Sequence, residues 1–235
     1  MQRYFLDEKN QIQIEDIHHI RHVMRMKTND EVELCDTDGA CFLARLTVDN
    51  TRVLFERIAS LETVHKTNSI TLIQGIAKGD KNEFVVKYAT QFGVDTIIFV
   101  EMKRSISKMD TQTWDKKKDR YEKIALESAR LAHRNTVPKV IFIPSLKQLI
   151  TPFDHAFVAY ENDRETPFLD KIHRVKPKES IALLVGPEGG IDESEMALLK
   201  DKGFVSVGLG NRILQTEVAC LYGLSVIDGI LETKR

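Results

Sequence analysis

The chain has 235 residues, of which 42% are hydrophobic and 29% are charged, values that are ordinary for a globular protein. Its formal net charge of −1 excludes a uniformly basic nucleic-acid-binding protein. No apolar run approaches the roughly 20 residues of a membrane span, and the first residues carry no apolar signal segment, so we expect a cytoplasmic protein without a membrane anchor.

Residues 1–60 predict a small β-rich unit with one helix. Apolar residues recur at close to helical spacing from Ile14 to Met24, and the period then falls to two between Val32 and Phe55. The sequence Asp36-Thr-Asp-Gly39 predicts a hairpin turn within this second part. A polar stretch at 61–68 predicts a boundary, which gives domains at 1–68 and 69–235.

From Ser69 onward, short apolar runs alternate with helical segments. The runs are 70–76, 96–100, 139–143, 155–160, 181–185 and 205–209, and the helical segments include 82–92, 116–134, 193–202 and 214–231. Strands that alternate with helices predict an α/β fold, in which a parallel sheet is covered on both faces.

Three loops follow predicted strands in the last third of the chain, at 160–163, 186–190 and 209–216. In an open parallel sheet, ligands bind beyond the carboxyl ends of the strands, where these loops would lie. The second loop, Gly186-Pro-Glu-Gly-Gly190, is rich in glycine and precedes Asp192 and Glu195, which have the spacing of a helix capping box. It matches neither a Walker A motif nor a complete dinucleotide fingerprint. From its residues alone, the loop is either a ligand-binding turn or a tight strand-to-helix connection.

The positive charge is unevenly distributed. Residues Lys103–Lys139 contain 11 Lys and Arg against 5 Asp and Glu, and His18–Lys27 contains three Lys and Arg, three His and no acid. These segments are either phosphate-binding patches or solvated helix faces.

The three cysteines are expected to be reduced. They are Cys35, Cys41 and Cys220, and no cluster of Cys and His has the spacing of a zinc site. We therefore expect no metal.

Several motifs resemble one family in the same order along the chain. The loop Gly186–Gly190, the stretch Leu209-Gly-x-Arg-Ile-Leu214 and the pair Thr216-Glu217 resemble the signature of the SPOUT methyltransferases. Nearly the whole chain is similar to the 16S rRNA (uracil-N3)-methyltransferases, also through His19-x-x-x-Val-x-Arg-x-Lys27 and Arg134-x-x-Val-Pro138. It departs from the family pattern at Gln215, at Val218 and at 131–132.

The resemblance implies a fold and an activity. The expected fold is a small N-terminal PUA-like β-barrel followed by a C-terminal parallel-sheet SPOUT domain with a trefoil knot. The implied cofactor is S-adenosylmethionine, and the implied partners are 16S rRNA or the small ribosomal subunit and a second copy in a homodimer.

The three loops and the resemblance together nominate site residues. For the acceptor, Arg134 is expected near the target nucleotide, and Glu217 is a weaker candidate for handling the uracil proton. The expected cofactor-binding residues are Tyr160, Glu161, Gly186, Pro187, Glu188, Gly189, Leu209, Gly210, Ile213 and Leu214. The expected RNA-binding residues are Arg3, His19, Arg21, Arg25, Lys27, Lys103, Arg104 and Lys108.

Two alternatives stay open. The departures from the family pattern are compatible with a non-catalytic RNA-binding module that has kept the fold. The loops are also compatible with an unrelated α/β enzyme that binds another nucleotide.

Overall fold

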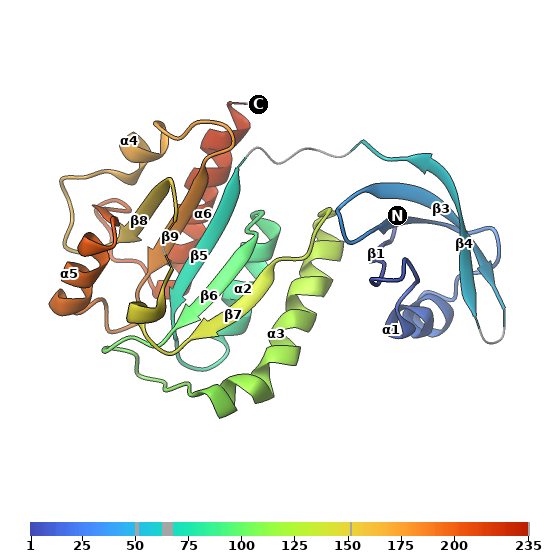
Figure 1. Ribbon diagram of the computed structural model, residues 1–235, viewed down its shortest axis with the longest axis horizontal. Helices are drawn as coiled ribbons and strands as arrows, with labels where there is room; N and C mark the ends of the chain where they lie inside the picture. The colour runs from blue at the N-terminus through green and yellow to red at the C-terminus, as the bar shows by residue number, and fades with distance from the viewer. Residues whose placement is uncertain (50–51, 63–67, 151, 235) are drawn as a thin grey trace. The chain divides into compact units, whose positions relative to one another are not determined.

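The chain folds into two compact units (Figure 1). The computed structural model describes residues 1–49, 52–62, 68–150 and 152–234. The first unit comprises Met1–His65 and Ala129–Val137, and the second comprises Lys66–Ser128 and Pro138–Arg235. The division falls close to the boundary predicted after residue 68, although 63–67 of the predicted linker lie outside the described residues. The sequence did not predict that 129–137 belongs to the first unit.

The first unit is built on a four-stranded sheet. Its strands are β1 (Arg3–Phe5), β2 (Glu31–Cys35), β3 (Cys41–Val48) and β4 (Val53–Ser60), in the order β1-β2-β3-β4. The predicted antiparallel pairing holds for β2, β3 and β4, whereas β1 runs parallel to β2. Val32 and Leu34 are fully buried, as their period of two predicts.

The helix of the first unit does not bury all of the apolar residues that the sequence predicts. Helix α1 (Ile14–His18) continues into a π-helical turn, η1 (His19–Val23), in which Ile20 is buried as expected. Ile14, however, is 85% exposed, and Asp16 is 1% exposed. Asp16 tolerates burial because both of its carboxylate oxygens accept hydrogen bonds from Arg130, at 2.5 and 2.7 Å.

The expectation of three reduced cysteines is wrong for two of them. Cys35 and Cys41 lie directly opposite each other in the antiparallel register of β2 and β3, with 4.1 Å between their Cα atoms, and they form a disulfide. Cys220 keeps a buried thiol.

The second unit contains a six-stranded sheet in which every pairing is parallel. Its strands are β5 (Ser69–Gly75), β6 (Thr96–Val100), β7 (Lys139–Ile143), β8 (His155–Ala159), β9 (Ser180–Val185) and β10 (Val205–Val207). The strand order is β10-β8-β9-β5-β6-β7. All six predicted apolar runs coincide with strands, which confirms the α/β class. The trefoil knot that the resemblance implies stays a prediction.

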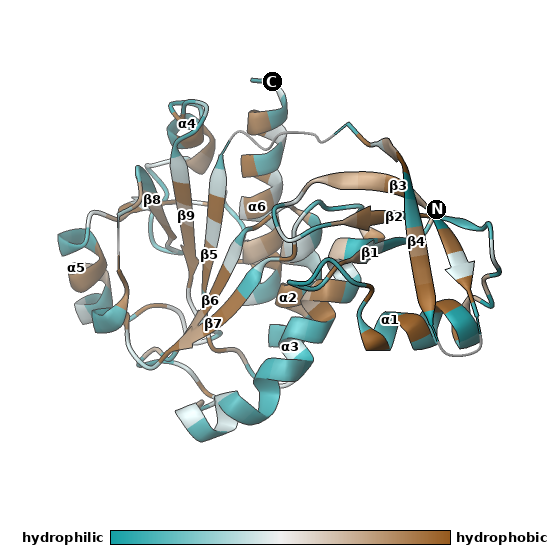
Figure 2. Cartoon of the chain, turned by 45° about the vertical axis from the view of Figure 1, so that its right-hand side comes forward, coloured by the Kyte–Doolittle hydropathy of each residue, from teal (hydrophilic) through white to brown (hydrophobic). Residues whose placement is uncertain are grey.

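Helices cover both faces of this sheet, as predicted. They are α2 (Lys81–Gln91), α3 (Thr111–Leu131), η2 (Leu146–Gln148), α4 (Phe168–Ile172), α5 (Glu193–Asp201) and α6 (Thr216–Glu232). In β9, Leu183 meets Gly223 of α6, while its neighbour Leu184 packs in a core cluster with Leu199 of α5. Figure 2 shows α3 as largely hydrophilic, whereas α6, like the strands, carries many hydrophobic residues.

One predicted helix start is confirmed in detail, whereas another helix begins earlier than predicted and two helices were not predicted. The capping box that opens α5 is confirmed, because the Asp192 carboxylate accepts from the Ser194 N–H while Glu195 accepts from the Asp192 N–H. Helix α3 begins at Thr111, five residues earlier than expected, and α4 and η2 were not predicted.

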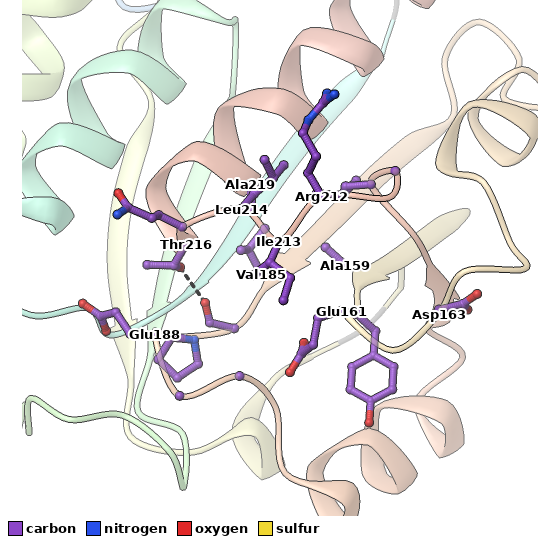
Figure 3. A pocket seen from close by; sticks show the side chains of 18 of the residues that line it. Ala159, Glu161, Asp163, Val185, Glu188, Arg212, Ile213, Leu214, Thr216 and Ala219 are labelled. Carbon is purple, nitrogen blue, oxygen red and sulfur yellow. Dashed lines mark hydrogen bonds between the residues drawn. The ribbon is translucent and has the colours of Figure 1, made fainter.

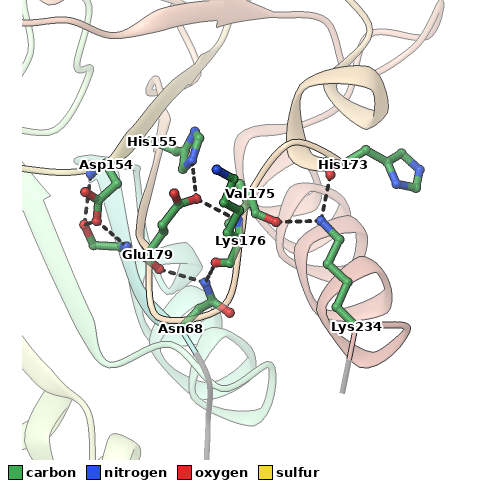
Figure 4. Close-up of polar contacts among 9 residues, drawn as sticks. Asn68, Asp154, His155, His173, Val175, Lys176, Glu179 and Lys234 are labelled. Carbon is green, nitrogen blue, oxygen red and sulfur yellow. Dashed lines mark hydrogen bonds and ion pairs between the residues drawn. The ribbon is translucent and has the colours of Figure 1, made fainter.

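Polar contacts connect the loops at the amino-terminal ends of the strands of the large sheet (Figure 4). At the amino-terminal ends of β8 and β9, Asn68 donates to the backbone oxygens of Lys176 and Glu179, at 2.6 and 2.8 Å. From the end of α6, Lys234 donates to the backbone oxygen of Val175 at 2.6 Å. The predicted cofactor-binding residues lie instead beyond the carboxyl-terminal ends of the strands.

Candidate functional site

The three predicted loops meet around one cavity of about 570 Å³ at the carboxyl ends of β8, β9 and β10 (Figure 3). Segments 159–164, 185–190 and 209–215 form most of its wall, and Lys81 of α2 with Thr216 and Ala219 of α6 completes it. All ten residues predicted to bind the cofactor line this cavity. The alternative of a loop without a ligand-binding role therefore loses its main support, because the loop faces an open space of ligand size.

Close approaches between loops explain the glycines of the central loop. A side chain at Gly189 would come within 2.6 Å of the backbone oxygen of Arg104. Gly190 has φ +74°, and a side chain there would collide with the Glu161 carboxylate. Glycine is required at both positions because another backbone or side chain already occupies the space of a Cβ.

Thr216 connects the first turn of α6 to two strands. Its hydroxyl donates to the backbone oxygen of Gly186 at 2.6 Å and accepts from the side-chain amide of Gln74 at 2.8 Å. Thr216 is 5% exposed and Gln74 is fully buried. This pair of hydrogen bonds fixes where the loop 209–215 ends relative to the loop 186–190.

Lys81 is a charged residue of the site that sequence reasoning missed. Its Nζ lies 3.1 Å from a Glu217 carboxylate oxygen and 3.6 Å from one of Glu188. The Glu188 oxygen also accepts from the backbone N–H of Lys78 at 2.9 Å. The signal for Lys81 was a Lys-Gly-Asp-Lys turn after β5, but its relevance depends on β5 lying beside β9, which the sequence does not reveal.

These contacts set the charges at the cavity wall. Burial alone would raise the pKa of Glu188, but the Lys78 N–H and the Lys81 ammonium hold that pKa below its usual value. The hydrogen bond to Glu217 raises the pKa of Lys81. Both groups therefore carry their charges at neutral pH, so the wall presents an ammonium held by carboxylates.

The rest of the wall is part polar and part apolar. Figure 3 shows Glu161 and Glu188 on different sides of the cavity, with Ile213, Leu214 and Val185 between them. Ile213 is 88% exposed, so the cavity is open on the side of the 209–215 loop.

The RNA-binding residues predicted in the first unit differ in accessibility. Arg25 and Lys27 are exposed, Arg21 is half-buried, and the ring of His19 is held by the hydroxyl of Tyr4 at 3.0 Å. Arg3 is 9% exposed, and its Nε donates to Glu33 at 2.8 Å. Its guanidinium is engaged within the unit, and its contact with RNA stays a prediction.

The three basic residues predicted in the second unit are at its surface, each beside an acid. Lys103 and Arg104 lie 3.2 and 3.8 Å from Asp192, and Lys108 lies 3.1 Å from Glu101. Their side chains are 60%, 47% and 64% exposed. Exposed pairs of this kind are weak and exchange readily for other anions.

The two predicted catalytic residues do not line the cavity. Arg134 follows the end of α3 and belongs to the first unit. Glu217 lies behind Lys81 in the first turn of α6.

Neither a membrane span nor a metal site is found in the part of the chain that the structure describes. Within residues 1–49, 52–62, 68–150 and 152–234, no helix combines the length and apolar character that crossing a bilayer requires. Over the same ranges, no three His, Cys, Asp or Glu side chains are grouped to hold a metal ion.

Two protein families match the chain in separate segments. The family described as RNA methyltransferase domain matches residues 65–228, and the family described as RNA methyltransferase PUA domain matches residues 12–56.

Individual proteins match over almost the whole length. Ribosomal RNA small subunit methyltransferase E of Bacillus subtilis is 37% identical, over 97% of this chain and 96% of its own. The structure of a ribosomal RNA small subunit methyltransferase E from Neisseria gonorrhoeae bound to S-adenosyl methionine is 28% identical, with a TM-score of 0.82 over 97% of both chains. A putative methyltransferase from Legionella pneumophila, in complex with the cofactor SAM, is 26% identical, with a TM-score of 0.84 over 97% of this chain and 96% of that one.

We expect Thr216→Val to lower the free energy of unfolding by about 1–3 kcal/mol, because it removes the hydroxyl that donates to the buried Gly186 carbonyl and one of the two acceptors of the buried Gln74 amide. Thr216→Ser is the matched control, since it keeps the hydroxyl. Urea unfolding of the two variants measures the difference. If both are destabilised equally, the hydroxyl is not the connection between α6 and the strands.

Proposed function

Since the chain belongs to the family of RNA methyltransferases, we propose that it transfers a methyl group from S-adenosylmethionine to N3 of a uracil in 16S rRNA of the small ribosomal subunit. Such a substrate would place the enzyme in the cytoplasm, where ribosomes are assembled.

The observation that carries this proposal is the single cavity walled by all three predicted loops. Its volume of about 570 Å³ is within the range of pockets that enclose a nucleoside-sized ligand. Backbone groups of 186–190 and 209–215 are available for the polar edges of adenine and ribose. Val185 and Leu214 offer apolar surface, and Glu161 offers a carboxylate.

S-adenosylmethionine supplies a methyl group bonded to a positively charged sulfur. Uracil N3 would attack the methyl carbon in line, and the sulfur would leave as a neutral thioether. The protein has to align the acceptor with this methyl group and to remove the proton from uracil N3. No metal is needed for either task.

For the acceptor, we assign Arg134 to the target nucleotide. A guanidinium beside a uracil oxygen would favour the anionic form of the base, which is the form that attacks. For the uracil proton, Lys81 would pass one of its own protons to Glu217, 3.1 Å away, and take up the proton of N3 in its place, since Lys81 lines the cavity.

The predicted basic residues form the proposed RNA track, and most of them are exposed. Phosphate contacts fix the position of an RNA without reading its sequence, and such contacts need accessible cations. The track comprises His19, Arg21, Arg25, Lys27, Lys103, Arg104 and Lys108.

We also propose that the working unit is a homodimer formed through α6. Val218 and Tyr222 lie one turn apart on this helix and are 42% and 40% exposed. Val218 adjoins Ala219, which lines the cavity, so a second copy seated here would reach the site.

The purified protein should transfer labelled methyl groups from S-adenosylmethionine to 16S rRNA in small subunits, at N3 of a uracil. Ala159→Leu should abolish both donor binding and transfer without loss of fold, because Ala159 lines the cavity and is only half-buried. Ala197→Leu, on the exposed face of α5, is the matched control and should behave as wild type. Calorimetric titration of the donor and mass spectrometry of the digested RNA are the measurements.

Three outcomes would count against parts of the proposal. Absence of donor binding by the wild type would favour the non-catalytic RNA-binding module. A methyl group on another atom of the RNA would overturn the N3 assignment alone. Donor binding that survives in Ala159→Leu would place the donor outside this cavity.

Arg25→Ala should weaken RNA binding, because one phosphate contact is lost. The slope of the logarithm of affinity against the logarithm of salt concentration should become shallower by about one. Donor affinity should not change. Filter binding over a range of salt concentrations, with Arg174→Ala as the exposed-arginine control, tests this. An unchanged salt slope removes Arg25 from the RNA track.

Tyr222→Glu should convert dimers to monomers, because a buried carboxylate without a partner opposes association. Leu54→Glu changes an equally apolar exposed residue in the first unit and should leave the dimer intact. Sedimentation velocity distinguishes the two. A wild-type monomer at all concentrations would rule out the dimer.

A further inference from the structure

Helix α3 ends in a conformation that normally requires glycine. The N–H of Arg134 donates to the carbonyl of Ala129 at 2.9 Å, and the N–H of His133 donates to the carbonyl of Arg130 at 3.1 Å. This is the Schellman arrangement, in which the residue after the helix has a positive φ. His133 has φ +50°, a left-handed conformation in which a side chain is strained relative to glycine.

The side chain of His133 is held in place. Its Nδ1 lies 2.8 Å from a carboxylate oxygen of Glu33, which also accepts from Arg3 Nε at 2.8 Å. Arg3 in turn donates to the backbone oxygen of His133 and, at 3.2 Å, to the side chain of Asn135. Arg3 and Glu33 come from neighbouring strands and are paired in register, so their geometry is set by the sheet.

A second contact holds the same helix end. Arg130 donates twice to the buried Asp16, and its guanidinium also lies 5.5 Å from the centre of the Tyr4 ring. The last turn of α3 and the residues that follow are therefore fixed on both sides of His133.

The ionisation state of Glu33 supports the same arrangement. Burial alone would raise the pKa of Glu33, but the hydrogen bonds from His133 and Arg3 lower it below the usual value. Glu33 is therefore a carboxylate at neutral pH and can hold both partners.

We propose that Arg3, Glu33 and His133 form a clamp that positions Arg134 for the target nucleotide. The inference rests on the role of Arg134 under the proposed function. All three act through the backbone on either side of Arg134 and are positioning residues, not catalytic ones. A glycine at 133 would adopt the same φ without strain but would lose the contact with Glu33, so the imidazole is what ties the residue before Arg134 to the sheet.

His133→Gly separates positioning from stability. It relieves the positive φ but removes the contact with Glu33, and because these two effects on the free energy of unfolding oppose each other, little net change in stability is expected, while loss of the clamp should lower kcat at least about tenfold. Donor affinity should change by less than twofold. Lys178→Gly is the matched control, because Lys178 also has a positive φ, of +72°, and lies on an exposed loop. It should keep the wild-type kcat.

A double-mutant cycle with Arg134→Ala tests the route of the effect. If His133 acts through Arg134, then His133→Gly combined with Arg134→Ala should be no slower than Arg134→Ala alone. Glu33→Gln should reproduce the loss in His133→Gly, and it should also add nothing in the Arg134→Ala background.

Each contrary result overturns the clamp. A wild-type kcat in His133→Gly removes its functional role, and multiplicative losses in the cycle show that it acts without Arg134. An unchanged kcat in Arg134→Ala leaves nothing to position, although methyl transfer by the protein would stand. If the wild type transfers no methyl group, the proposed function fails. The same cycle, measured as RNA affinity, then decides the clamp, and additive losses overturn it.

Discussion

The cavity depends on how α6 begins. The hydroxyl of Thr216 is bonded to Gly186 on one side and to Gln74 on the other, and all three groups are withdrawn from water. In a parallel sheet the strands deliver loops to a common edge, but they do not fix the distance between those loops. This hydroxyl does so, because an unbonded donor or acceptor at that depth would cost more than the bond contributes.

The strands of the second unit could largely be predicted from the sequence. Each buried strand is a short apolar run, and each run ends at a loop, so period and length were enough to locate them. The loops that wall the cavity were also located, because glycine and proline after a strand are local signals. The strand order was not readable, and for this reason Lys81 was missed.

Two of the differences come from pairing between residues that are distant in the sequence. Arg3 was expected to contact RNA, and no sequence signal indicated that Asp16 would be buried. Their partners, Glu33 and Arg130, are 30 and 114 residues away. The disulfide between Cys35 and Cys41, which are six residues apart, depends instead on hairpin register, which spacing does not specify. Whether a charged side chain can be buried depends on its partner, and a single sequence does not show which distant residues become partners.

Helix α3 belongs to two units at once, since the chain divides between Ser128 and Ala129 within it. Cutting the chain once, in the linker near residue 65, would not yield two intact pieces. The C-terminal fragment would keep the last turn of α3 without Asp16, Glu33 and Arg3, and would expose a cationic stub. The N-terminal fragment would lose the partner of its buried carboxylate. Attempts to exchange or delete the small unit therefore have to carry 129–137 with it.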